Sequence, residues 1–215
     1  MSEYIIRNTA VALPDLTGKA FEPETCAFCA AADCAPIASH VWPEFAAYQP
    51  EARAYAAFEN GDLKVLLCAK EETIRAEETR CGGAVCVDSC LEFFFMPFPE
   101  KDQRYLNIES NAAGTVHIGL GAGRPDRKVW TELPEGFSIT ASKHEGAWWA
   151  IAYTVPASFL KEIFGEALGA GCAFRANFYN CDETIHPHFG TWNPVVAPQP
   201  DFHRPECFGT VRIEG

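Results

Sequence analysis

Positive charge is scarce in this sequence. Seventeen Lys and Arg stand against 29 Asp and Glu, which gives a formal net charge of −12 at pH 7. A surface this acidic repels phosphate backbones and anionic lipid at long range. No cluster of Lys or Arg offsets that charge. We therefore expect neither a nucleic-acid partner nor a membrane partner.

Long apolar runs are missing as well. The longest strongly apolar run lies around residues 91–98, far short of the roughly 20 residues that a membrane-spanning helix needs. The first residues, Met-Ser-Glu-Tyr-Ile-Ile-Arg-Asn, do not form a basic region followed by an apolar stretch, so they do not resemble a signal peptide. We expect a cytoplasmic protein whose 10 cysteines are reduced thiols.

Local enzyme signatures are also absent. The sequence contains no Gly-rich phosphate loop, no His-Glu-x-x-His and no Gly-x-Ser-x-Gly. Because many enzymes lack local motifs, this absence is weak evidence by itself. Together with the binding features described below, it leads us to expect a protein without catalytic activity.

The patterns that are present indicate β-structure. Alternating segments on either side of turn signals predict hairpins at residues 53–69, 105–120 and 136–155. Further strands are expected at residues 4–7, 90–96, 172–179 and 208–213. Helical spacing after a proline predicts one short helix at residues 156–164. Short strands with frequent turns are typical of an all-β sandwich or barrel, and we predict a single domain over residues 1–215, with residues 1–40 poorly assigned.

Cysteine and histidine spacing raises the question of metal binding. Two cysteine groups, Cys26-x-x-Cys29 with Cys34 and Cys81 with Cys86 and Cys90, and the segment 186–188 are candidate ligand sets. Only Cys26 and Cys29 have the short spacing typical of zinc knuckles. Core thiols and histidines bonded to the backbone explain the same residues, so we expect no bound metal.

Two other features are candidates for binding. Asp88 and Glu92 flank the start of the Phe-rich strand, with a spacing that would place both side chains on one face. Paired carboxylates serve in glycoside hydrolysis or bind sugar hydroxyls. Trp192 lies among Gly, Thr, Asn and Pro in an expected loop, where a flat ring suits the C–H face of a sugar.

These residues fall within motifs that resemble a known family. Val87-Asp-Ser-Cys-Leu-Glu-Phe-Phe-Phe resembles the W-x-D-S-x-V-E-F-F strand of family 9 carbohydrate-binding modules. Segment 105–109 with Gly114 resembles the next strand of the family, and the order of motifs at 175–179, 186–188, 191–194 and 201–209 also follows it. The likeness covers roughly residues 40–215. It implies an antiparallel β-sandwich of the DOMON or immunoglobulin-like jelly-roll type, and the binding of a carbohydrate.

The resemblance also implies site residues. In sugar-binding members two Trp side chains clamp a terminal sugar and a Glu accepts its hydroxyl groups. Glu92 matches that Glu and Trp192 matches one Trp, but Cys86 stands where the other Trp belongs. We therefore expect Trp192 as platform and Glu92 as hydroxyl acceptor. The remaining expected ligand-binding residues are Arg175, Asn177, Asn107 and Trp130.

Alternatives remain open. Family members often carry structural calcium, but no full set of calcium ligands is recognised here. We therefore expect no cofactor, and structural calcium stays an open alternative. The missing clamp residue at Cys86 also fits a sandwich protein that has lost its sugar site and binds a partner. A metal-assisted hydrolase using Asp88, Glu92, His186 and His188 is a third interpretation. The identity of the sugar and the oligomeric state are not predictable from the sequence.

Overall fold

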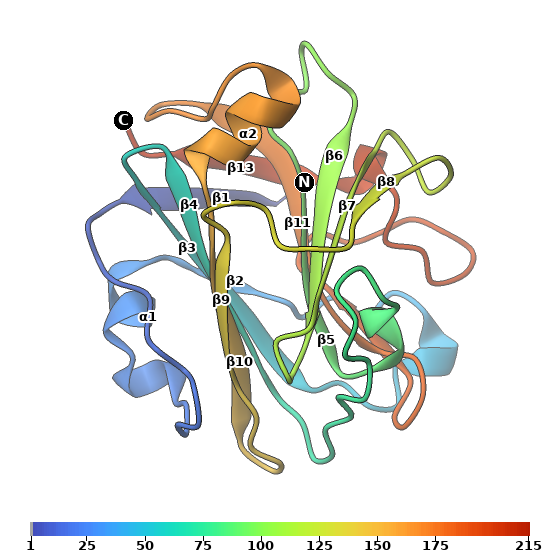
Figure 1. Ribbon diagram of the computed structural model, residues 1–215. Helices are drawn as coiled ribbons and strands as arrows, with labels where there is room; N and C mark the ends of the chain where they lie inside the picture. Colours follow the sequence, from blue (N-terminus) through green and yellow to red (C-terminus); the bar gives the residue numbers. More distant parts are fainter. Residues whose placement is uncertain (1) are drawn as a thin grey trace.

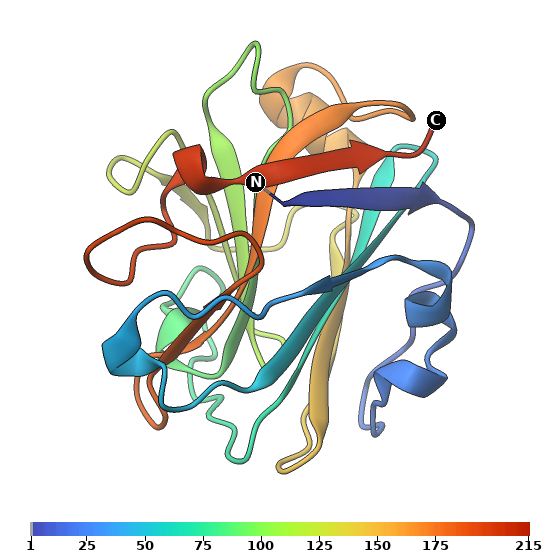
Figure 2. The ribbon, with the colours of Figure 1, turned by 180° about the vertical axis from the view of Figure 1, so that it is seen from behind.

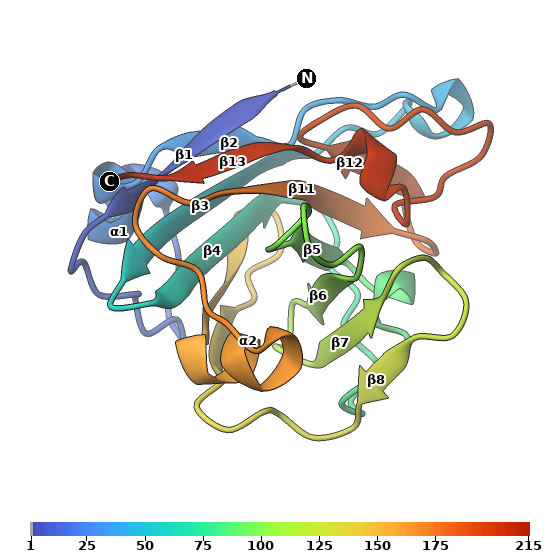
Figure 3. The ribbon, with the colours of Figure 1, turned by 90° about the horizontal axis from the view of Figure 1, so that it is seen from above.

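The computed structural model describes residues 2–215, which form two β-sheets packed face to face (Figures 1 and 3). Sheet A contains, in spatial order, β8 (Lys128–Trp130), β7 (Val116–Gly121), β6 (Tyr105–Asn111), β5 (Cys90–Met96), β11 (Ala173–Asp182) and β13 (Gly209–Ile213), with β12 (His188–Thr191) paired to β11. Sheet B contains β3 (Glu51–Glu59), β4 (Asp62–Lys70), β10 (Trp148–Val155) and β9 (Ser138–Ser142), with β2 (Cys34–Pro36) paired to β3. The predicted all-β sandwich is confirmed.

Strand β1 (Glu3–Asn8) joins the two sheets. Its residues 3–6 pair in parallel with β13 of sheet A, and its residues 7–8 pair in parallel with β3 of sheet B. Figure 2 shows β1 and β13 side by side near the two chain ends. These two pairings are the exceptions to the antiparallel pattern expected from the hairpins.

The core between the sheets follows from the two-residue period of the strands. Alternate residues of β5 point inward, so Leu91, Phe93 and Phe95 are fully buried in the main apolar cluster. The Phe93 ring stacks on that of Phe178 from β11, with centroids 4.8 Å apart. The other residues of β5 are buried on the opposite face, so this strand is covered on both sides.

The outer face of sheet B is covered by the N-terminal segment. The short helix α1 (Ala27–Ala31) places Phe28 and Cys29 against Leu66 and Trp148 of the sheet. The sequence left residues 1–40 poorly assigned, and α1 lies within that segment. Five residues give too little periodicity to be recognised, and the helix is held by burial against the sheet.

The predicted helix is confirmed as α2 (Ala157–Phe164). It begins after Pro156 and ends at Gly165, whose φ of 78° is the left-handed conformation that favours glycine at this position. The carboxylate of Asp62 accepts a hydrogen bond from the first helical N–H, at 2.8 Å. The helix lies across one end of the sandwich (Figure 3).

The three predicted hairpins are confirmed as β3–β4, β6–β7 and β9–β10. Strands β2, β8 and β12 were not predicted, since each has only three or four residues. No helix within residues 2–215 has the length and apolar character needed to cross a membrane.

Candidate functional site

A pocket of about 210 Å³ opens on the outer face of sheet A, the side turned away from sheet B. Its polar lining includes Glu92, Glu109, His117, Arg124, Asp201 and His203. Its less polar lining includes Cys86, Phe94, Cys181, Phe189 and Phe202. Charged groups that converge beside aromatic rings in a concave space are the usual composition of a small-molecule site.

The floor of the pocket is a row of side chains across three strands. Period two puts Glu92 on the outer face of β5, because its neighbours Leu91 and Phe93 point into the core. The hairpin register sets Glu109 of β6 directly opposite Glu92, and His117 of β7 opposite Glu109. The floor is therefore fixed by strand pairing rather than by loop conformation.

Two carboxyl groups at adjacent buried positions repel each other when both are charged. Burial, followed by the charge of Glu109, raises the pKa of Glu92 well above its usual range. Burial also raises the pKa of Glu109, although the nearby His117 charge and a hydrogen bond from Asn107 favour its ionised form. Glu92 is therefore the better hydrogen-bond donor of the two, and Glu109 the better acceptor.

Asn107 holds Glu109 in place. Its side-chain amide donates to Oε1 of Glu109 at 2.7 Å, and its oxygen accepts a hydrogen bond from Arg127. Gly119 lies opposite Asn107 in the register. A methyl group there would come within 2.3 Å of the Asn107 oxygen, so a larger residue at this position would displace the Asn107 side chain that holds Glu109.

The wall of the pocket comes from the segment before β13. Asp201 accepts a hydrogen bond from Arg124 at 2.9 Å, and the His203 ring lies 2.7 Å from the Tyr105 hydroxyl. Burial, together with the charges of Arg124 and Arg127, lowers the pKa of His203 to about 3. The ring is therefore neutral near pH 7 and has one donor and one acceptor nitrogen.

Aromatic rings line the other side. Phe202 stacks on Tyr179 of β11 with ring centroids 4.1 Å apart and planes 11° apart. Phe189 of β12 meets Phe202 edge to face at 5.9 Å. Phe189 is only partly buried and lines the pocket, so part of its surface is available to a ligand.

Of the six expected ligand-binding residues, only Glu92 lines this pocket. Asn107 lies directly behind it, one hydrogen bond away through Glu109. Cys86, the position where the family resemblance expects a Trp, also lines the pocket.

The two expected tryptophans lie elsewhere. Trp192 follows β12 and packs, partly buried, against the main core, edge to face with Tyr4 at 6.2 Å and with Phe178 at 5.7 Å. The sequence placed Trp192 in a loop, whereas pairing of the unpredicted β12 with β11 continues sheet A up to Thr191, immediately before it. Trp130 also packs toward the main core, 5.3 Å from the Phe159 ring.

Arg175 and Asn177 share one face of β11 because side chains two residues apart in a strand point the same way, but neither lines the pocket. The guanidinium of Arg175 donates to the carbonyl oxygens of Phe208 and Gly209. The Asn177 side chain exchanges hydrogen bonds of 2.8 Å with the backbone of Asn193. Both contacts hold the C-terminal segment against sheet A.

Asp88 does not line the pocket that contains Glu92. It precedes β5 after a turn of 3₁₀-helix, and its Oδ2 accepts hydrogen bonds from the backbone N–H groups of Glu77 and Glu78, each at 2.9 Å. Its carboxylate is therefore engaged by the chain that precedes β5 and is not directed into the pocket. Asp88 stabilises the connection before β5, and the carboxylate that accompanies Glu92 is Glu109.

The expected histidine pair is structural. His188 is fully buried, and its Nδ1 donates to the carbonyl oxygen of His186 at 2.7 Å. Its Nε2 lies 3.1 Å from the Asn180 oxygen. Burial lowers the pKa of His188 to about 4. Neither His186 nor His188 lines the pocket, so the residues of the hydrolase interpretation do not converge on it.

Glu71 belongs to the same buried polar group and gives a pH prediction. Its Oε1 accepts a hydrogen bond from Asn180 at 3.0 Å, and burial raises its pKa to about 7. Since the folded protein keeps this proton to higher pH than the unfolded chain, the stabilisation is present below about pH 4.5 and is lost as the pH rises through 7.

The size of this effect is on the order of 3 kcal/mol. Because Gln has no such proton to lose, the free energy of unfolding of Glu71→Gln, compared with that of the unsubstituted protein, should rise by that amount between pH 4.5 and pH 8. Urea denaturation of both proteins at each pH measures it. Parallel pH profiles for the two proteins would contradict the prediction.

The sequence of this chain matches a known protein family. The model of carbohydrate-binding family 9 matches residues 23–213. The chain therefore belongs to this family of carbohydrate-binding domains. No curated protein sequence matches the chain.

Solved structures share the fold. A putative carbohydrate-binding protein from Bacteroides uniformis has 24% identity and a TM-score of 0.77, with 99% of each chain covered. A family 9 carbohydrate-binding module from Caldicellulosiruptor kristjanssonii in complex with glucose has 8% identity and a TM-score of 0.67, with 100% of this chain and 96% of that chain covered. The same kind of module with cellotriose has 10% identity and a TM-score of 0.63, with 100% and 94% covered.

Proposed function

We propose that this protein binds the terminal unit of a soluble saccharide in the pocket on sheet A, without catalysing a reaction. The supporting observation is the convergence of Glu92, Glu109, Arg124 and Asp201 beside the Phe189 ring in one small pocket. Its volume of about 210 Å³ lies below the roughly 300–1,000 Å³ of pockets for drug-sized ligands, which suits one sugar ring.

The division of roles follows from charge and burial. Glu109, held by Asn107, accepts hydrogen bonds from sugar hydroxyls, and Glu92 donates or accepts according to its proton. Arg124 donates, and the partly exposed Phe189 packs against the C–H face of the ring. The family and the glucose and cellotriose complexes of its solved members support a glucose-containing ligand.

Two further parts of this proposal concern the setting of the protein. Binding of this kind needs no cofactor, and the ten cysteines, all of them free thiols, suit the reducing cytoplasm. The sandwich architecture is also that of DOMON-like domains, which we propose as its wider relatives.

Isothermal titration calorimetry with glucose, cellotriose and a panel of other soluble saccharides tests the function. We expect saturable binding of one saccharide class, weakened about tenfold or more by Glu109→Gln and by Glu92→Gln, since a hydrogen bond to a charged group contributes about 1.5–3 kcal/mol. Glu162→Gln, at an exposed position on α2, makes the same chemical change outside the pocket and should bind normally.

Circular dichroism melting establishes that each variant is folded. Heat signals that stay flat for the whole panel with folded protein would favour the partner-binding alternative. In that case Cys86, which lines the pocket where the family resemblance expects a Trp, would explain the lost affinity.

A further inference from the structure

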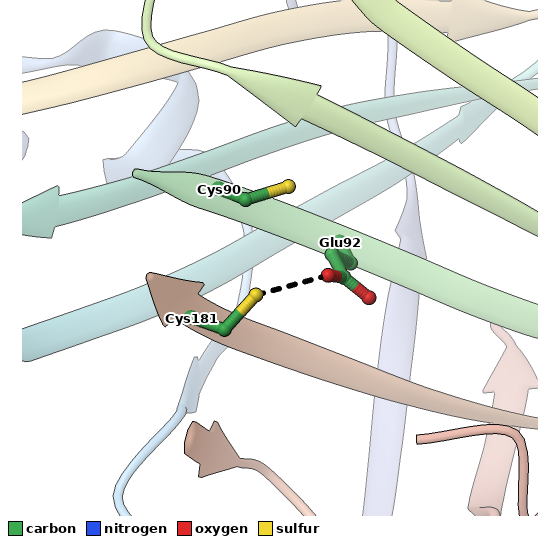
Figure 4. A group of neighbouring side chains, drawn as sticks. All are labelled: Cys90, Glu92 and Cys181. Carbon is green, nitrogen blue, oxygen red and sulfur yellow. Dashed lines mark hydrogen bonds between the residues drawn. The ribbon is translucent and has the colours of Figure 1, made fainter. Parts of the chain in front are cut away.

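Two thiols and a carboxyl group meet at the floor of the pocket (Figure 4). The ligand atoms of Cys90, Glu92 and Cys181 all lie within 4.8 Å of one another, and all three residues are buried. Within residues 2–215, this is the single group of three or more such side chains that close together.

Strand pairing produces this arrangement. Cys90 of β5 and Cys181 of β11 are direct cross-strand partners, and Glu92 lies two residues further along β5 on the same outer face. The Cys181 thiol lies 3.2 Å from Oε1 of Glu92 (Figure 4). The three groups are therefore placed by two rigid central strands, which is the setting that a precise ligand site requires.

The spacing suits a small cation of intermediate softness. Zinc–sulfur bonds of about 2.3 Å and zinc–oxygen bonds of about 2.0–2.2 Å place tetrahedral ligands roughly 3.3–3.8 Å apart, so small rotamer changes close the site. Two thiolates with one carboxylate select Zn²⁺ over Mg²⁺ or Ca²⁺, which prefer oxygen ligands.

The fourth position faces the pocket. Cys181 and Glu92 line the pocket, whereas Cys90 is fully buried beneath it. Cys86 lines the pocket from the other side, and its carbonyl oxygen lies 3.9 Å from the Cys181 sulfur. The fourth ligand is thus a water molecule.

The carboxyl group of this cluster has no cationic side chain as a partner. No Lys, Arg or His in residues 2–215 forms an ion pair with Glu92. A divalent cation supplies the missing charge and allows all three groups to be ionised together.

We propose that Cys90, Cys181 and Glu92 bind one Zn²⁺ ion at the floor of the pocket, with the fourth coordination position open to the pocket. Binding displaces two thiol protons and the Glu92 proton, so affinity rises with pH. One carboxylate oxygen of Glu92 binds the metal and the other remains for a ligand in the pocket. This inference does not depend on the proposed sugar binding.

Titration of the reduced, metal-free protein with Co²⁺, a spectroscopic substitute for Zn²⁺, tests the site. We expect one equivalent to produce visible d–d bands of tetrahedral cobalt and a near-ultraviolet thiolate charge-transfer band, both displaced by Zn²⁺. Cys181→Ser and Glu92→Gln should weaken binding at least tenfold. Melting curves establish that each variant is folded, and Glu92→Gln serves if Cys181→Ser does not fold.

Cys26→Ser is the matched control. Cys26 and Cys29 form another close thiol pair, on the outer face of sheet B, so Co²⁺ bands that persist in Cys26→Ser and vanish in Cys181→Ser assign the metal to the pocket. Bands lost in Cys26→Ser but kept in Cys181→Ser, or no bands at all, would overturn the proposal. Sugar titrations with and without Zn²⁺ separate this result from the proposed function, because either can fail alone.

Discussion

Replacing Phe178 by alanine is expected to reduce the free energy of unfolding by about 3–5 kcal/mol. The Phe178 side chain is completely buried at the centre of the sandwich. Its ring stacks on Phe93 and meets Tyr4 and Trp192 edge to face, with centroid distances of 4.8, 5.7 and 5.7 Å. Truncation removes these contacts and leaves a cavity that rigid strands cannot fill.

Guanidinium chloride denaturation followed by Trp fluorescence measures the loss. Phe98→Ala removes the same atoms from a partly exposed ring that meets Phe164 at 5.6 Å, so its effect should be clearly smaller. Equal losses for the two variants would show that Phe178 is not the centre of the core.

Asp88→Ala is expected to cost a similar amount, about 3–5 kcal/mol, because it removes one partner of a buried charged network. Besides the hydrogen bonds from the backbone N–H groups of Glu77 and Glu78, Asp88 accepts a hydrogen bond from the Asn111 amide at 2.8 Å. Its Oδ1 lies 3.1 Å from Nε of Arg75. Without the carboxylate, these donors are left without an acceptor in a place that water does not reach.

Asp15→Ala is the matched control for Asp88→Ala. Asp15 forms an exposed ion pair with Lys19, and pairs of this kind contribute little to stability. Urea denaturation should show unchanged stability for Asp15→Ala and an intermediate loss for Asp88→Asn, which keeps one acceptor oxygen. A loss for Asp88→Ala no larger than that for Asp15→Ala would contradict the role assigned to Asp88.

The strands were largely predictable because their signal is local. Alternation, turn residues and the Phe-rich run fixed β5 and the three hairpins to within a few residues. Strand β12 was missed because four residues carry too little pattern, and without this strand Trp192 was expected in a loop.

The pocket was harder to predict because it depends on the pairing of distant strands. Glu109 was present in the motif that resembles the family, but only the β5–β6 register shows that it faces Glu92. Cys181 joins Cys90 across 91 positions of the chain through the β5–β11 pairing, for which no local signal exists. Asp201 and His203 reach the pocket on an irregular segment whose path the sequence pattern does not constrain.

Strand β1, which joins the two sheets, cannot complete its pairing until synthesis of the chain is almost finished. Strand β1 is made first, but its partner β13 is made last, about two hundred residues later. Contacts of such separation are slow to form because a long loop must close first. The hairpins of each sheet can assemble as they leave the ribosome, whereas the β1–β13 pairing that joins the sheets cannot form until β13 has emerged.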